Sequence, residues 1–183
     1  MAEKTVVARH TGGMRFVATT GSGHDVVVDN AEGDTGPRPT ELVVVALATC
    51  TGMDIASILA KKRQRVHAYR VEVRAVQREE RPDVFTRIEV VHVVEGEAIS
   101  ETAVRRAIEL SATKYCPVSA MLCAGTAEIH HRYRIEDRGS GPEPTVASGT
   151  VLVTGPYQRP ETLAPAEPAG DAAAGAGAGR ARE

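Results

Sequence analysis

The sequence predicts an α+β fold with mainly antiparallel sheet. Three observations lead to this prediction. Strand-like segments come in groups instead of alternating regularly with helices. A long apolar segment with the marks of a helix follows the first group of strands. Residues 138–183 differ in composition from the rest, because they hold six of the ten prolines and eight of the seventeen glycines. We therefore expect residues 1–137 to form one domain and residues 138–183 to form a disordered tail.

The N-terminal segment alternates apolar and polar residues in three short stretches, TVVARH, MRFVATT and HDVVVD, which are separated by glycines. This pattern is typical of short strands joined by turns. The next segment, GPRPTELVVVALATCTGMDIASILAKKRQ, has prolines near its start and basic residues at its end. It predicts a helix of about 25 residues that begins at Pro39 or Thr40. Its first half is apolar nearly all round, so we expect an obligate dimer that buries it.

The second half of the domain begins with two alternating stretches, HAYRVEVRAVQRE and VFTRIEVVHVVEGE, which predict a long β-hairpin with one face on the core. SETAVRRAIELSATKY then predicts an amphipathic helix. A short helix after Pro117 and a last strand, AEIHHRYRIED, complete the domain. In the tail, SGTVLVTG is consistent with a short strand or a docking peptide, but so small an apolar patch does not offset the ordering entropy of the whole segment. We therefore expect that removing residues 140–183 changes stability little.

Composition and charge exclude several classes of function. The formal net charge is −2 and the basic residues are scattered, which argues against nucleic acid and anionic membranes as partners. The run KKRQR fits cations at a helix C-terminus that face water. No apolar core follows the first charges as in a signal peptide, and the uncharged run 42–53 is shorter than the about 20 residues that cross a bilayer. We expect a cytoplasmic protein.

The three cysteines are the candidate reactive groups. Cys116 directly precedes Pro117, which places it at the N-cap of the short helix, where unpaired N–H groups favour a thiolate and lower a thiol pKa. Cys50 lies among small residues in the middle of the long helix. For both residues the alternative is simple burial as a small hydrophobe. Cys123 would be two helical turns and about 10 Å from Cys116, beyond disulfide reach, so we interpret it as a packing residue.

A metal site is not expected. His130 and His131 are adjacent on a predicted strand, so their side chains point to opposite faces and do not readily bind one ion. His24, His67 and His92 are isolated in strand-like segments.

The segment PTELVVVALATC, followed further along by KYCPVSAML and preceded by a three-stranded start, resembles the OsmC/Ohr family of hydroperoxide-reducing proteins. The resemblance covers about residues 5 to 137. It implies an OsmC-like fold with antiparallel sheets around long central helices. It also implies an intertwined homodimer with two active sites at the interface, which need no cofactor.

The resemblance implies that Cys50 is the peroxidatic cysteine and that Cys116 is the resolving cysteine. The substrate would be an organic hydroperoxide, and the reductant a small dithiol or a dithiol-bearing protein. Arg15 and Glu41 would hold the thiolate, but the family glutamate falls at Thr40 in this chain, and the alternative role of Glu41 is to cap the helix. The alternative for Arg15 is an exposed strand residue. The rival hypothesis is a non-catalytic dimer that binds an apolar small molecule at its interface.

Overall fold

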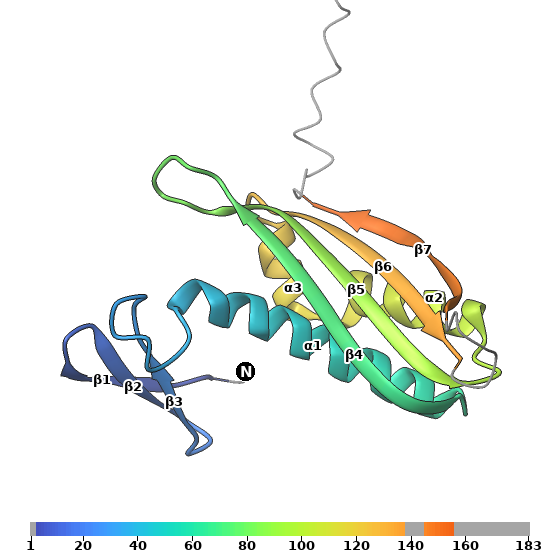
Figure 1. Ribbon diagram of the computed structural model, residues 1–183, viewed down its shortest axis with the longest axis horizontal. Coiled ribbons are helices and arrows are strands. Elements are labelled where there is room, and N and C mark those ends of the chain that lie inside the picture. Colours follow the sequence, from blue (N-terminus) through green and yellow to red (C-terminus); the bar gives the residue numbers. More distant parts are fainter. Residues whose placement is uncertain (1–2, 138–144, 156–183) are drawn as a thin grey trace, which may run out of the picture.

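A computed structural model describes residues 3–137 and 145–155. The elements follow the predicted order, with one more strand at the end (Figure 1). They are β1 (Val6–Gly12), β2 (Arg15–Thr20), β3 (Asp25–Val28), α1 (Pro39–Lys61), β4 (Arg65–Gln77), β5 (Phe85–Glu97), α2 (Glu101–Leu110), the π-helical turn η1 (Ser111–Tyr115), α3 (Pro117–Cys123), β6 (Glu128–Glu136) and β7 (Thr145–Thr154).

The strands form two sheets. A small antiparallel sheet has the order β1-β2-β3, and a larger sheet has the order β4-β5-β6-β7. All neighbouring strands are antiparallel except β5 and β6, so the prediction of mainly antiparallel sheet is confirmed. The parallel pair arises because α2, η1 and α3 carry the chain back across the sheet between these two strands. The three helices cover one face of the larger sheet, and α1 links it to the small sheet (Figure 1).

Strand β7 corrects the prediction that the tail is disordered from residue 138 onward. It pairs antiparallel with β6 over nearly its whole length, and Ala147, Val151 and Leu152 pack against the core. The sequence argument weighed only the apolar side chains of this segment. The edge of β6 adds a hydrogen-bond partner for its backbone groups, which an isolated segment does not have. The remainder of the predicted tail, residues 138–144 and 156–183, lies outside the described residues.

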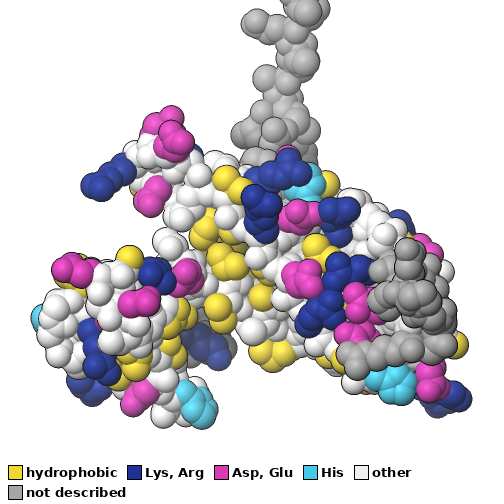
Figure 2. Space-filling model, in the orientation of Figure 1, with side chains coloured by type: hydrophobic (Ala, Val, Ile, Leu, Met, Phe, Trp, Pro, Cys, Tyr) yellow, Lys and Arg dark blue, Asp and Glu magenta, His cyan; other side chains and the backbone are white. Residues whose placement is uncertain are grey.

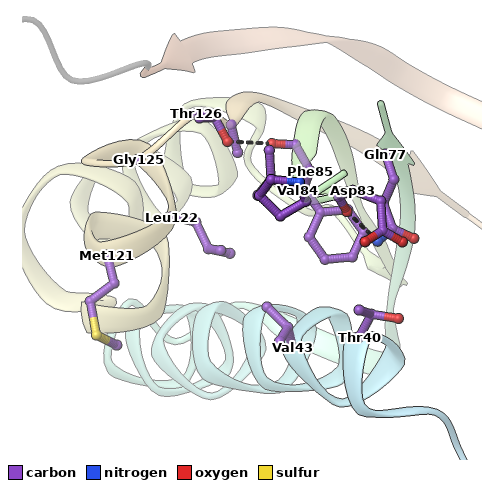
Figure 3. Close-up of a pocket in the computed structure, with 12 residues that line it drawn as sticks. Thr40, Val43, Gln77, Asp83, Val84, Phe85, Met121, Leu122, Gly125 and Thr126 are labelled. Carbon is purple, nitrogen blue, oxygen red and sulfur yellow. Dashed lines mark hydrogen bonds between the residues drawn. The ribbon is translucent and has the colours of Figure 1, made fainter. Parts of the chain in front are cut away.

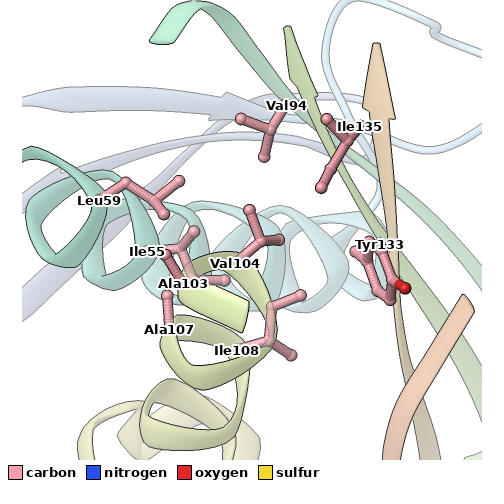
Figure 4. Packing of buried hydrophobic residues seen from close by; sticks show 9 residues of the cluster. All are labelled: Ile55, Leu59, Val94, Ala103, Val104, Ala107, Ile108, Tyr133 and Ile135. Carbon is pink, nitrogen blue, oxygen red and sulfur yellow. The ribbon is translucent and has the colours of Figure 1, made fainter. Parts of the chain in front are cut away.

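The core between helices and sheet has two apolar clusters separated by a polar layer. The first cluster gathers around Ile55, Val94 and Tyr133 (Figure 4), and the second contains Leu47, Val90 and Ile129. On each of α1, β5 and β6, the inward position between the two clusters is polar. These three residues are Thr51, His92 and His131, each at most 1% exposed. Such a layer is stable only if its polar atoms find partners inside the fold.

The small sheet has no core of its own in one protomer. No residue of β1, β2 or β3 is buried, and Val6, Val7 and Phe16 are exposed. Helix α1 also exposes Val45 and Met53. Figure 2 shows hydrophobic side chains on the small sheet and on the middle of the molecule, on either side of the hollow between them. By length and composition α1 would also suit a membrane span, although one of its faces packs against β4 and α2.

Candidate active site

Cys50 and Cys116 meet in the second apolar cluster. Cys50 is half-buried on α1, and Cys116 is buried in front of α3. The packing of α1 against η1 and α3 brings the two side chains into one cluster, close enough that the Cys50 sulphur raises the pKa of Cys116. All three cysteines are free thiols. The two residues that the sequence singles out as a reactive pair are therefore neighbours, which is the geometry that thiol–disulfide chemistry needs.

Gly52 allows α1 to lie close to the sheet beside this pair. A Cβ atom at this position would come within 3.3 Å of Cγ2 of Val71 on β4, which is tighter than ordinary van der Waals contact. The neighbouring ring of Tyr69 would be 3.9 Å away. A larger side chain would push the helix outward, together with the cysteine two residues before it.

Cys116 occupies the predicted N-cap, but its pKa moves in the opposite direction from the prediction. Its sulphur accepts the backbone N–H of Ser119 at 3.3 Å, and this bond, with a weaker contribution from Val118, favours the thiolate. Burial outweighs both and raises the pKa of Cys116, and the neighbouring Cys50 sulphur raises it further. The expected low pKa is therefore wrong, because the cost of desolvation exceeds the help from the helix N-terminus. The raised pKa means that Cys116 keeps its proton at neutral pH.

The residues expected to hold the thiolate lie elsewhere in the protomer. Glu41 accepts the backbone N–H of Arg38 at 2.8 Å and therefore caps α1. It stands nine residues before Cys50, about 13 Å along the helix axis. Arg15 is exposed at the start of β2 on the small sheet. Within residues 3–137 and 145–155, no hydrogen bond or ion pair joins either residue to a cysteine.

A chain of hydroxyl groups beside the thiols is the part of the site that sequence reasoning missed. Thr51, next to Cys50, lies 2.9 Å from the hydroxyl of Ser111, and Ser111 donates to Asp54 Oδ2 at 2.9 Å. The only sequence signal was a serine on the inward face of the predicted amphipathic helix, where an apolar residue would be usual.

The third cysteine is buried in the second cluster, as predicted. The Sγ of Cys123 donates to Oγ1 of Thr154 at 3.1 Å and so ties α3 to the end of β7. The same hydroxyl lies 3.2 Å from Nε2 of His131. Cys123 thus serves packing and the attachment of β7.

The two inward histidines are buried in the polar layer, and each has one hydrogen-bonded nitrogen. His92 Nδ1 lies 2.8 Å from the hydroxyl of Tyr69, and burial lowers the pKa of His92 to about 3. Burial likewise lowers the pKa of His131 to about 4. In the described part of the chain, no set of three or more His, Cys, Asp and Glu side chains is grouped as metal ligands would be.

An apolar cavity of about 330 Å³ lies beside the second apolar cluster, which contains the thiols. It is bounded by the start of α1, the tip of the β4–β5 hairpin and α3 (Figure 3). Val43, Phe85 and Leu122 point into it. Phe85 and Leu122 also pack against the cluster that contains Cys50 and Cys116. A second hollow of about 440 Å³ shares Thr40 and Phe85 with the first. The site therefore combines two thiols with room for an apolar group nearby.

The chain is similar in sequence and in fold to several known proteins. A family model described as OsmC-like protein matches residues 31–132. Protein YhfA of Escherichia coli strain K12 is 39% identical over 123 residues, which are 67% of this chain and 91% of YhfA. A hypothetical protein from Aquifex aeolicus VF5 is 29% identical, with a TM-score of 0.67 over 75% of this chain and 99% of that chain. The organic hydroperoxide resistance protein OhrB of Bacillus subtilis shares the fold at 19% identity, with a TM-score of 0.51 over 73% of this chain and 98% of that chain.

Proposed function

The chain belongs to the OsmC-like protein family, and we propose that it reduces organic hydroperoxides in oxidative-stress defence, with Cys50 and Cys116 as the reacting thiols. The two cysteines come from distant segments of the chain and lie in one cluster, and this proximity carries the proposal. The resistance to organic hydroperoxides that is named for OhrB is consistent with it.

Cys50 is the peroxidatic residue in this scheme. Its thiolate attacks the distal oxygen of the hydroperoxide, the O–O bond breaks, and Cys50 becomes a sulfenic acid while the alkoxide takes a proton and leaves as an alcohol. Burial, which raises the pKa of Cys116, keeps the proton on this thiol and suits it to be the second of the two to react. The thiol of Cys116 then condenses with the sulfenic acid, which forms the disulfide and releases water. An external dithiol restores both thiols and is oxidised to its own disulfide. The cytoplasm, where thiols are kept reduced, suits this cycle.

A homodimer is part of the same proposal. The small sheet has no buried residue in its strands, and α1 exposes apolar side chains, so a second copy is the natural cover for both. Obligate homodimer interfaces bury about 2,000–5,000 Å² in total, so both exposed apolar regions would lie within one such interface. In an intertwined dimer, Arg15 or Glu41 would reach a thiol pair only through the partner subunit, because neither contacts a cysteine within one protomer.

A second candidate function is the binding of an apolar small molecule without chemistry. The cavity lined by Val43, Phe85 and Leu122 favours it, because its walls are mostly apolar and adjoin the thiol cluster. In this case the cysteines would only fill space.

Peroxide consumption with dithiothreitol as reductant tests the two functions. The wild type should consume cumene hydroperoxide faster than hydrogen peroxide. Cys50→Ser should abolish consumption. Without added thiol, Cys116→Ser should allow one oxidation and leave Cys50 as sulfenic or sulfinic acid, detectable by mass, and its turnover should be lost or depend on the external thiol. Cys123→Ser is the matched control and should retain turnover. Continued turnover by Cys50→Ser, or a peptide map of the oxidised wild type without a Cys50–Cys116 linkage, would refute the proposal and favour the binding function.

A further inference from the structure

We propose that Ser111 is a positioning residue that holds the two thiols in register for closure of the Cys50–Cys116 disulfide. The inference rests on the proposed function, since it concerns the step in which that disulfide forms. This buried serine is hydrogen-bonded both to the helix that carries Cys50 and to the backbone of Cys116.

The first link joins Ser111 to the helix that carries Cys50. Because Ser111 donates its hydroxyl proton to the carboxylate of Asp54, its oxygen is free to accept the proton of the Thr51 hydroxyl, 2.9 Å away. Ser111 is fully buried and Thr51 is 1% exposed, so water cannot replace the bond between them, whereas the bond to Asp54 is partly buried. Thr51 and Asp54 are three residues apart on α1, about one helical turn. By bonding to both, Ser111 fixes the rotation of this helix about its axis and its position along that axis.

The second link joins the same residue to Cys116. The backbone N–H of Cys116 donates to the carbonyl oxygen of Ser111 at 2.9 Å, and this five-residue step is the hydrogen bond of the π-helical turn η1. Isolated π-helical turns are rare and occur frequently at functional sites. Here the turn ends directly before Cys116, the proposed resolving cysteine and the N-cap of α3. Its backbone hydrogen bond therefore fixes the position of Cys116 relative to Ser111.

These links matter because disulfide geometry is narrow. The two Cβ atoms must come within about 3.5–4.5 Å, and one residue of slippage on a helix rotates a side chain by about 100°. In the closing step the Cys116 sulphur forms a bond to the Cys50 sulphur, the S–O bond of the sulfenic acid breaks, and the hydroxyl leaves with the thiol proton as water. A misplacement of about 1 Å can slow such a step by about 100-fold.

The test measures how readily the disulfide closes in the full-length protein, without peroxide. In dithiothreitol redox buffers, the ratio of oxidised to reduced protein gives the effective concentration of one thiol at the other. Ser111→Ala should lower this value at least about tenfold. Thr51→Val, which removes the hydroxyl and keeps the shape, should also lower the effective concentration. Thr51→Ser keeps the hydroxyl and should give a value near that of the wild type. Ser57→Ala, a serine on the exposed side of α1, is the matched control and should match the wild type.

The equilibrium separates positioning from general stability, because a change that weakens reduced and oxidised forms equally leaves it unchanged. Values for Ser111→Ala and Thr51→Val within twofold of the wild type, with all proteins folded, would overturn the proposal. So would a wild type that forms no Cys50–Cys116 disulfide in these buffers. A wild type that closes the disulfide but consumes no peroxide would refute the proposed function and leave the positioning role supported.

Discussion

Acidification from pH 7 to pH 5 should destabilise the fold through the two buried histidines. The pKa of His92 is lowered to about 3 and that of His131 to about 4, in both cases chiefly by burial. In the unfolded chain both titrate near 6.5. A histidine with a lowered folded-state pKa contributes stability that is present above pH 6.5 and is lost as the pH falls toward the folded value.

The magnitude follows from proton linkage. At pH 5 both side chains remain neutral in the fold, whereas in the unfolded chain each is almost fully protonated. Each histidine therefore costs about 2 kcal/mol between pH 7 and pH 5, and the pair costs about 4 kcal/mol per protomer. This loss is large beside a typical unfolding free energy of about 5–15 kcal/mol. The carboxylates whose pKa values are lowered by ion pairs, Glu89 and Glu136, stay ionised in the fold and add only about 0.1 kcal/mol each, because at pH 5 about a fifth of each is protonated in the unfolded chain.

Urea unfolding at fixed protein concentration measures the effect, because a dimer makes apparent stability depend on concentration. His92→Gln and His131→Gln should each remove about half of the pH dependence, whatever they do to stability at pH 7. His67→Gln changes an exposed histidine and should leave the dependence intact. A loss below about 1 kcal/mol in the wild type, or full pH dependence in His92→Gln, would refute the reasoning.

Two further predictions concern the edges of the fold. A chain that ends at residue 137 should melt about 10 °C below one that ends at Gly155, because it loses about 3 kcal/mol from Val151, Leu152 and the hydroxyl of Thr154. A difference below about 2 °C in scanning calorimetry would mean that β7 contributes little. Sedimentation equilibrium should give a dimer at micromolar concentration, and Val45→Glu should shift it toward monomer. A folded wild-type monomer at that concentration would contradict the proposed dimer.

Much of the fold was predictable because its signals are local. Apolar periodicity located each strand and helix of residues 5–137, and Pro39 and Pro117 marked two helix starts. The strand β7 was not predictable in this way. Its stability depends on the free edge of β6, and that edge exists only after the sheet has formed.

Part of the candidate site was likewise predictable from local signals in the sequence, and part was not. Sequence position alone put Cys116 at a helix N-cap, since capping depends on neighbouring residues, and the family resemblance implied Cys50 as its partner. Sequence position also left two roles open for Glu41, and the observed hydrogen bond to Arg38 shows that it caps α1. Whether Glu41 also acts in catalysis stays a prediction.

Only the tertiary structure decided the chemistry around the thiols. The pKa of Cys116 depends on how many atoms from distant segments exclude water from it, and that number cannot be read from the residues beside it. The same holds for the link between Ser111 and Thr51, whose hydroxyl groups are 60 positions apart in sequence and 2.9 Å apart in space. Propensity and capping act over a few residues of chain, and the sequence therefore determined the elements. Desolvation and buried hydrogen bonds act between elements, so they follow only from how those elements pack.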